Sequence, residues 1–157
     1  MGAINRITSF SVDHDKLTPG IYVSRVDGDV VTYDVRMKLP NKGDYLENAA
    51  MHTFEHLFAT YARNSAWTNE VIYVGPMGCR TGFYLLLRNS VSYADAIRLV
   101  QESFRFIAEF EGAIPGAQFP RECGNYLEHD LVGARKIAED MCGVLAAWQE
   151  KDLYYLP

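Results

Sequence analysis

The sequence predicts an α+β fold in which helices pack on one face of an antiparallel sheet. Two neighbouring segments, 21–26 and 30–38, are rich in β-branched and aromatic residues, and Asp27-Gly28 between them is a strong hairpin signal. Further along the chain, apolar residues recur at helical spacing in several stretches. The chain has 157 residues, a usual length for one domain. We therefore expect residues 1–157 to form a single domain.

The other elements follow in chain order. A helix is predicted over 46–64, because its apolar residues recur every three or four positions: Met51, Phe54, Leu57, Phe58 and Tyr61. Residues 71–74 and 82–87 read as strands, and the segment between them is rich in residues that break regular structure. Ser92 begins a helix that runs to about 111, with Asp95 three residues on as an approximate capping box. A last helix is expected over 130–151.

Composition excludes several classes of protein. The chain has 15 basic against 20 acidic side chains and a net charge of −5, which disfavours a protein that coats nucleic acid or anionic lipid. No stretch approaches the roughly 18 apolar residues of a membrane helix, and residues 1–18 lack the apolar region of a secretory signal. The 3 cysteines cannot all pair within one chain. These features favour a soluble protein of the reducing cytoplasm.

The segment His52-Thr53-Phe54-Glu55-His56 predicts a metal site. On a helix, positions four apart lie only about 40° apart around the axis, so both imidazoles can bind one cation. Glu55 precedes the second histidine and can reach a molecule beside the metal. This order is the reverse of the familiar zinc-protease motif. Two unrelated histidines on a helix are the simpler alternative.

A catalytic metal site commonly has three protein ligands and one open position. Cys123, which precedes Gly124 in a loop-like stretch, is the candidate third ligand, and Glu122 and Glu128 are alternatives. A thiolate with two imidazoles favours zinc or iron(II) over magnesium or calcium.

The other two cysteines differ in their surroundings. Cys79 lies in a glycine-rich loop beside Arg80, whose charge favours the reactive thiolate, although a small residue packed in a tight turn explains it equally well. Cys142, between apolar residues of the last predicted helix, reads as ordinary core.

Together these motifs resemble the signature blocks of the S-ribosylhomocysteine lyase (LuxS) family. The blocks occur in the family's order from Ser9 to the last helix: Ser9-Phe10 with Val12-Asp13-His14, Asp34-Val35-Arg36 with Pro40-Asn41, His52 to His56, Pro76 to Tyr84, and Glu122 to Tyr126. One departure is visible. Many members have an acidic residue and a serine shortly before the Pro-Met-Gly-Cys segment, where this chain has Tyr73 and Gly75.

The resemblance implies a role for each matching residue. His52, His56 and Cys123 would hold one divalent metal per subunit, natively iron(II) and often zinc or cobalt in isolated protein. Glu55 and Cys79 would be the acid–base pair. Arg36, Ser9 and His14 would help to bind the substrate. The family's active sites lie at the interface of a homodimer, so this chain would be half of a functional unit.

The reaction that the resemblance implies is cleavage of S-ribosylhomocysteine to homocysteine and 4,5-dihydroxy-2,3-pentanedione, the precursor of the quorum-sensing signal autoinducer-2. The thioether lies on C5 of the sugar, so the carbonyl must migrate from C1 to C3 before the thiol can leave by β-elimination. Each migration removes a proton beside a carbonyl, and a metal acting as a Lewis acid stabilises the resulting anion. A thiolate at Cys79 suits the C–H protons, and Glu55 suits transfer among the oxygens.

Two other functions are consistent with the same histidines. In a metallopeptidase of the inverted-motif class, Glu55 would activate a metal-bound water and a downstream glutamate would be the third ligand. A chain of 157 residues leaves little room for the long peptide cleft of such an enzyme. In a closed structural zinc site, a residue such as His129 would be the fourth ligand.

Overall fold

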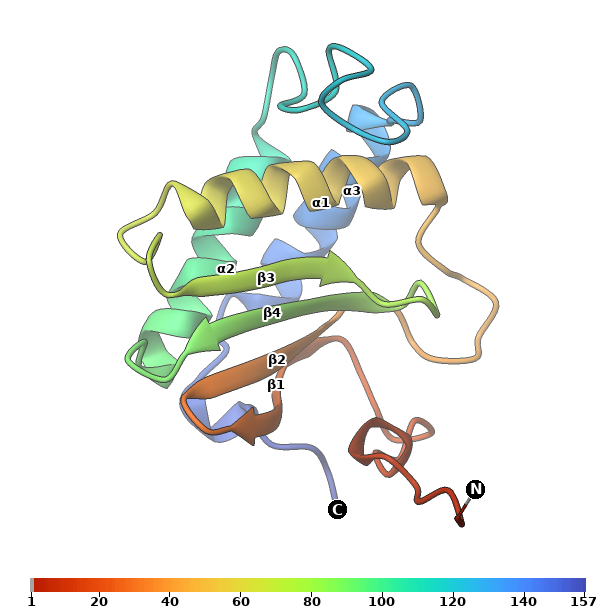
Figure 1. Ribbon diagram of the computed structural model, residues 1–157, viewed down its shortest axis with the longest axis vertical. Helices are drawn as coiled ribbons and strands as arrows, with labels where there is room; N and C mark the ends of the chain where they lie inside the picture. Colours follow the sequence, from red (N-terminus) through yellow and green to blue (C-terminus); the bar gives the residue numbers. More distant parts are fainter. Residues whose placement is uncertain (1) are drawn as a thin grey trace.

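The computed structural model describes residues 2–157. Its helices and strands, in chain order, are η1 (Thr8–Phe10), β1 (Gly20–Asp27), β2 (Val30–Arg36), α1 (Asn48–Arg63), β3 (Val71–Pro76), β4 (Gly82–Arg88), α2 (Tyr93–Ala108), α3 (Leu131–Leu145) and η2 (Glu150–Asp152). Figure 1 shows their arrangement, with α1 running alongside β3.

The strands form one antiparallel sheet in the order β1-β2-β4-β3. Side chains on a strand point alternately to its two faces. In β2 the residues Val31, Tyr33 and Val35 are buried in the main core, and they pair with Leu87, Leu85 and Phe83 of β4, which are buried in the same core. This alternation gives the central strands one strongly apolar face.

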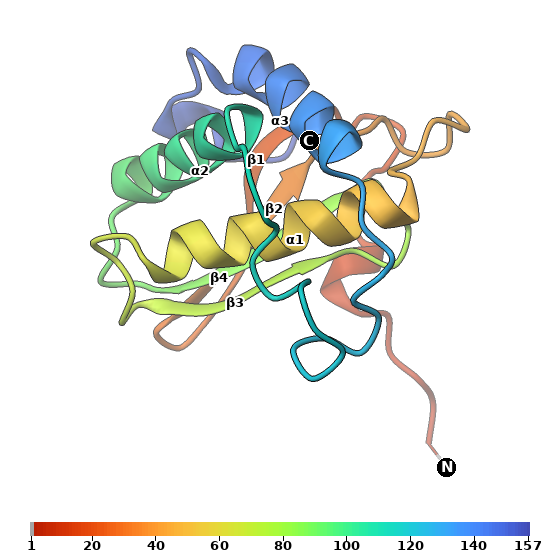
Figure 2. The same cartoon turned by 90° about the horizontal axis from the view of Figure 1, so that it is seen from above.

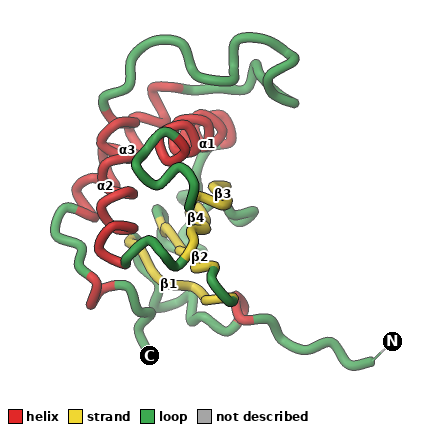
Figure 3. Tube along the Cα trace, turned by 60° about the vertical axis from the view of Figure 1, so that its left-hand side comes forward, coloured by secondary structure: helices red, strands yellow, loops and turns green. Residues whose placement is uncertain are grey.

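The helices cover that apolar face. Figures 2 and 3 show α1, α2 and α3 on the same side of the sheet. Phe54 of α1 packs on Phe83 of β4 with ring centroids 5.1 Å apart and on Phe104 of α2 with centroids 5.0 Å apart. Such aromatic contacts contribute beyond the area they bury and fix the spacing of the layers. The prediction of an antiparallel sheet with helices on one face is confirmed.

The opposite face of the sheet is polar in part. Asp34 and Arg36 of β2 and Tyr84 of β4 alternate with the core residues and therefore point away from the helices. Asp34 and Arg36 are nevertheless buried. Residues of the N-terminal segment and of the C-terminal tail contribute to a cavity with them, and both chain ends lie beyond the β1 edge of the sheet in Figure 1. On this face the Asp34–Arg36 pair is therefore covered by residues of the N-terminal segment and of the C-terminal tail.

The predicted elements are all present, and their ends differ by a few residues. The largest difference is the last helix, which we expected to reach residue 151 but which ends at Leu145. The indole N–H of Trp148 donates to the carbonyl of Ile21, 3.0 Å away on β1. The chain turns back toward the sheet to make this contact, and η2 follows as a separate short turn.

Within residues 2–157 no helix combines the length and the hydropathy that crossing a bilayer requires. All three cysteines of the described chain are free thiols.

Candidate functional site

Helix α1 presents His52, Glu55 and His56 on its partly exposed side. Phe54, Leu57 and Phe58 of the same helix are buried, because they face the sheet and α2. The three polar residues therefore lie on the flank that the core does not use, and each is half-buried. The long segment between α2 and α3 passes over this flank, as its contacts with both histidines show.

Two backbone carbonyls of that segment orient the histidine rings. The carbonyl of Glu128 lies 2.8 Å from Nδ1 of His52, and that of Pro115 lies 2.7 Å from Nδ1 of His56. A carbonyl oxygen only accepts, so each Nδ1 carries the proton and each Nε2 keeps a lone pair. The two Nε2 atoms are 3.1 Å apart. Because neither can donate to the other, a shared cation is the partner that satisfies both.

Cys123 completes a three-donor group. Its Sγ lies 3.3 Å from Nε2 of His52, and the N–H of Asn125 donates to this sulfur at 3.4 Å. The alternative third ligands are engaged elsewhere. Glu122 accepts the N–H groups of Gln118 and Phe119, and the Glu128 carboxylate accepts from the Asn125 amide. Two imidazoles and a thiolate fit zinc or iron(II).

His129 lies in the same cluster, whose four potential ligand atoms are all within 4.8 Å of one another. Its ring stacks on His52 with centroids 4.1 Å apart. The hydroxyl of Thr53 accepts the N–H of Asp130 and contacts Nδ1 of His129, both at 2.9 Å. If Thr53 donates its proton to Nδ1, then Nε2 of neutral His129 carries a hydrogen and has no lone pair for a metal. Burial, followed by the nearby His52 and His56, lowers the pKa of His129 to about 4.

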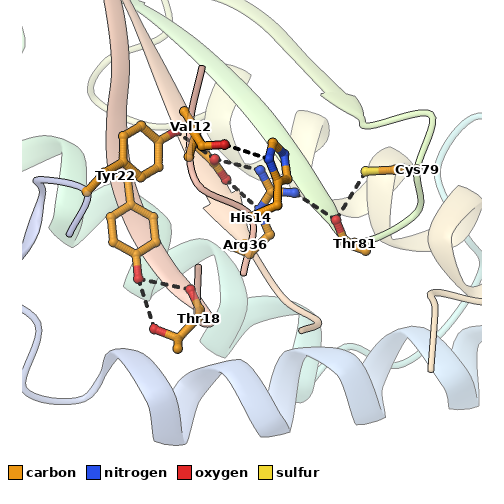
Figure 4. Close-up of polar contacts among 9 residues, drawn as sticks. Val12, His14, Thr18, Tyr22, Arg36, Cys79 and Thr81 are labelled. Atoms are coloured by element: carbon orange, nitrogen blue, oxygen red, sulfur yellow. Dashed lines mark hydrogen bonds and ion pairs between the residues drawn. The ribbon is translucent and has the colours of Figure 1, made fainter. Parts of the chain in front are cut away.

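A second group of predicted residues lines a cavity of about 230 Å³ on the other face of the sheet. Cys79, Arg36, Ser9 and His14 all contribute to its wall. Ser9 lies in η1, and the Nδ1–H of His14 donates to the carbonyl of Val12 at 2.8 Å. Figure 4 shows His14, Arg36, Thr81 and Cys79 next to one another. The structure thus brings together the thiol and all three predicted substrate-binding residues.

Arg36 is held in place by a buried ion pair. Its Nε and Nη2 donate to the two carboxylate oxygens of Asp34 at 3.1 and 2.7 Å. Burial by itself lowers the pKa of Arg36, but the hydrogen bonds and charge of Asp34 outweigh it and raise the pKa above its ordinary value. The guanidinium is therefore a fixed cation beside the cavity.

Arg80, which we expected to favour a thiolate at Cys79, points elsewhere. Its guanidinium donates to the carbonyl of Leu46 at 3.1 Å and lies over the ring of Tyr45, 5.7 Å from the ring centroid. Cys79 instead contributes to raising the pKa of Arg36 and is joined to it through the Thr81 hydroxyl. The cation coupled to the thiol comes from β2 and lies 43 positions away in the sequence.

The histidine–cysteine cluster and the Cys79 cavity are separate in one chain. None of the four cluster residues lines the cavity, and no hydrogen bond within residues 2–157 joins Cys79 to them. Glu55 belongs to the helix of the cluster. A larger hollow of about 500 Å³, between α2 and the C-terminal turn, contains none of the predicted site residues. Ile97, Trp148 and surface side chains of the C-terminal turn line it.

The side chain of Tyr73 lies directly against Gly75. A side-chain carbon added at Gly75 would lie 2.0 Å from the Tyr73 hydroxyl, so the tyrosine ring occupies the space that a serine would need. Neither residue lines the Cys79 cavity. The two residues that depart from the family pattern are therefore not part of the lining of the Cys79 cavity.

Sequence reasoning missed several residues of the two groups. Asp34, Tyr84 and Tyr155 line the cavity, and the Tyr155 hydroxyl donates to Asp34 at 2.7 Å. The available signal was the pair of charged residues at alternate positions of an otherwise apolar strand. Pro115 and Gly116 were also missed. Gly116 has φ +71°, and a side-chain carbon there would lie 3.1 Å from Nδ1 of His56.

Known proteins resemble this chain over nearly its whole length. Residues 7–152 match the family model described as S-Ribosylhomocysteinase (LuxS). The S-ribosylhomocysteine lyase of Phocaeicola vulgatus is 49% identical over 155 residues, which cover 95% of this chain and 96% of that protein. The proteins of the same name from Borreliella burgdorferi and Clostridium acetobutylicum are 46% and 44% identical, each covering 97% of this chain and 99% of the relative.

Proposed function

Because this chain belongs to the S-ribosylhomocysteine lyase (LuxS) family, we propose that it cleaves S-ribosylhomocysteine to homocysteine and 4,5-dihydroxy-2,3-pentanedione. The second product is the precursor of autoinducer-2. The chain acts as a single lyase domain over residues 1–157, in the reducing environment of the cytoplasm, where its cysteines stay unpaired.

One observation carries this proposal: a chain that matches the family over nearly its whole length brings two histidine Nε2 atoms and a thiol within reach of one cation. His52, His56 and Cys123 hold one divalent metal, natively iron(II), with zinc or cobalt(II) as substitutes. When bound, the metal supplies Lewis-acid stabilisation of negative charge on substrate oxygens.

Cys79 and Glu55 move the protons. Cys79 removes a proton from the carbon next to the substrate carbonyl and returns it to the former carbonyl carbon. The carbonyl group thereby shifts by one position along the sugar. Glu55 transfers protons among the substrate oxygens. Two such shifts place the carbonyl at C3, and loss of the C4 proton then breaks the C5–S bond and releases homocysteine.

Arg36, Ser9 and His14 bind the ribosyl part of the substrate. The cavity that they share with Cys79 is small and is lined by apolar side chains together with several polar and charged ones, which can bind sugar hydroxyls. Asp34 binds Arg36 through both carboxylate oxygens, so the guanidinium is presented in a fixed orientation. The substrate hydroxyls can therefore be ordered before any proton is moved.

We further propose that the functional unit is a homodimer with its active sites at the interface. Each chain contains a metal cluster and a separate Cys79 cavity, and the reaction needs both at one substrate. A symmetric dimer joins the cluster of one subunit to the cavity of the other, twice. Large apolar residues remain exposed on the N-terminal segment and around the cluster, including Ile7, Phe10, Leu127 and Val132.

Co-expressed inactive variants test the shared site. In a dimer of one Cys79→Ala chain and one His56→Ala chain, isolated through two different tags, one composite site keeps its intact thiol and its intact metal cluster. We expect this dimer to release homocysteine, whereas each homodimeric variant is inactive. Inactivity of the mixed dimer, with wild-type metal in its one intact cluster, would place each active site within a single chain.

The direct test of the function is homocysteine release from S-ribosylhomocysteine by protein purified without oxygen, followed with a thiol reagent. Release that stops after treatment with a chelator and returns with iron(II) is the expected result. Chelator-sensitive cleavage of casein without turnover of the sugar substrate would instead support the metallopeptidase alternative.

A further inference from the structure

Thr81 lies between Arg36 and Cys79 and contacts both (Figure 4). Its side chain is almost fully buried, with 2% of the residue exposed. Nη1 of Arg36 donates to Thr81 Oγ1 at 2.7 Å, and Sγ of Cys79 lies 3.1 Å from the same oxygen. One hydroxyl thus connects a buried cation to the thiol.

The donors and acceptors determine the direction of these hydrogen bonds. A guanidinium has no acceptor, so Arg36 must donate and Thr81 must use a lone pair. The single hydroxyl hydrogen of Thr81 then needs an acceptor, because an unpaired buried donor costs free energy. Among its described hydrogen-bond partners, the Cys79 sulfur is the one that can accept it. A thiolate is a far better acceptor than a protonated thiol, so the contact favours the charged form.

The cation behind Thr81 is fixed from its other side. Asp34 binds Arg36 through both carboxylate oxygens, and the Tyr155 hydroxyl donates to Asp34 at 2.7 Å. The side chains of the ion pair are 4% and 2% exposed. Arg36 therefore cannot turn toward solvent, and its charge steadily polarises the Thr81 hydroxyl.

The backbone fixes Thr81 as well. The Thr81 carbonyl accepts the N–H groups of Met37 and Lys38 at 2.8 and 3.0 Å, which ties the loop to the end of β2. Arg80 adopts a left-handed conformation with φ 59°, unusual for a residue other than glycine. This turn places the side chains of Cys79 and Thr81 on the same side of the loop, as Figure 4 shows.

We propose that Thr81 is a positioning residue for Cys79: it directs the sulfur into the cavity and stabilises the thiolate through a hydroxyl polarised by Arg36. The proposal rests on the proposed function only in giving that thiolate a catalytic task. Other charged or titratable groups also face the cavity, and the test keeps them unchanged: Asp34, Tyr84, Tyr155 and His14.

The test compares Thr81→Val, which keeps the shape and removes the hydroxyl, with Thr81→Ser, which keeps the hydroxyl. The measurement is the pH profile of Cys79 alkylation by iodoacetamide in the metal-loaded protein, followed by mass spectrometry of the Cys79 peptide. Losing a hydrogen bond to a charged group should slow alkylation near neutral pH by about tenfold in Thr81→Val and move the half-maximal rate to higher pH. Thr81→Ser should keep the wild-type profile.

Lyase kinetics provide a second measurement. We expect Thr81→Val to lower kcat with little change in KM, because the hydroxyl contacts the thiol and Thr81 does not line the cavity. Thr81→Ser should restore kcat. A wild-type alkylation profile in folded Thr81→Val would overturn the proposal. So would a Thr81→Ser profile displaced as far as that of the valine variant, since methyl packing would then explain the effect. The alkylation result needs no substrate, so it stands or fails independently of the lyase assignment.

Discussion

Replacing Cys79 with alanine is expected to abolish homocysteine release and to leave the metal content unchanged. The thiol is the only group of the cavity assigned to the C–H protons, and a positioned acid or base typically contributes about 10²–10⁴-fold. Cys79 lies outside the histidine–cysteine cluster, so its loss removes no proposed ligand. Turnover followed with a thiol reagent, together with elemental analysis of the same sample, measures both effects.

Cys142 provides the matched control. It is partly buried on α3, and burial raises the pKa of its thiol, so it is an inert cysteine. Cys142→Ala should retain wild-type turnover. Glu55→Gln should resemble Cys79→Ala, with activity lost and metal kept. Substantial turnover by Cys79→Ala would contradict its assignment as the base.

Replacing a proposed metal ligand should lower the metal content of the protein as well as its activity. In His56→Ala or Cys123→Ala, two donors remain where three converged, and we expect the purified protein to contain little metal and to be inactive. Elemental analysis after mild dialysis measures the loss. Stoichiometric metal in either variant would show that the cation is held by other residues.

His129→Gln separates an open site from a closed one. Because Thr53 can supply the proton for Nδ1 of His129, we expect three protein ligands and retention of metal in this variant. A closed structural site would need His129 as its fourth ligand, so the variant would lose metal and stability together. In cobalt-substituted protein, substrate should perturb the spectrum of an open site and leave that of a closed site unchanged.

Local patterns in the sequence were enough to predict much of the fold. The β-branched and aromatic content around Asp27-Gly28 and the helical spacing in α1 each depend on residues only a few positions apart, and the structure confirms the hairpin and the helix. The end of α3 was not predictable, because the contact that turns the chain joins Trp148 to Ile21, 127 positions away. The pattern of neighbouring residues does not predict a contact between residues so far apart in the sequence.

In the candidate site, too, some residues could be placed from local sequence and others could not. His52 and His56 are paired by helical geometry, so the sequence alone placed them together. The cation beside Cys79 was assigned to the adjacent Arg80, whereas Arg36 is the residue connected to the thiol. Adjacency in a loop does not say where a long side chain points. The left-handed turn at Arg80 and the pairing of Gly82 with Arg36 decide it.

The sequence by itself determined the fold class, the family and the residue types of the chemistry, because these depend on short-range periodicity and ordered motifs. Only the tertiary structure decided how those residues are divided into a metal cluster and a separate thiol cavity on opposite faces of the sheet. It also decided that Thr81, which contacts the thiol, accepts a hydrogen bond from Arg36, and that Tyr155 donates to Asp34. The Arg36–Thr81 and Asp34–Tyr155 hydrogen bonds join residues 45 and 121 positions apart, and packing of the whole chain, not any local preference, brings them within hydrogen-bond distance.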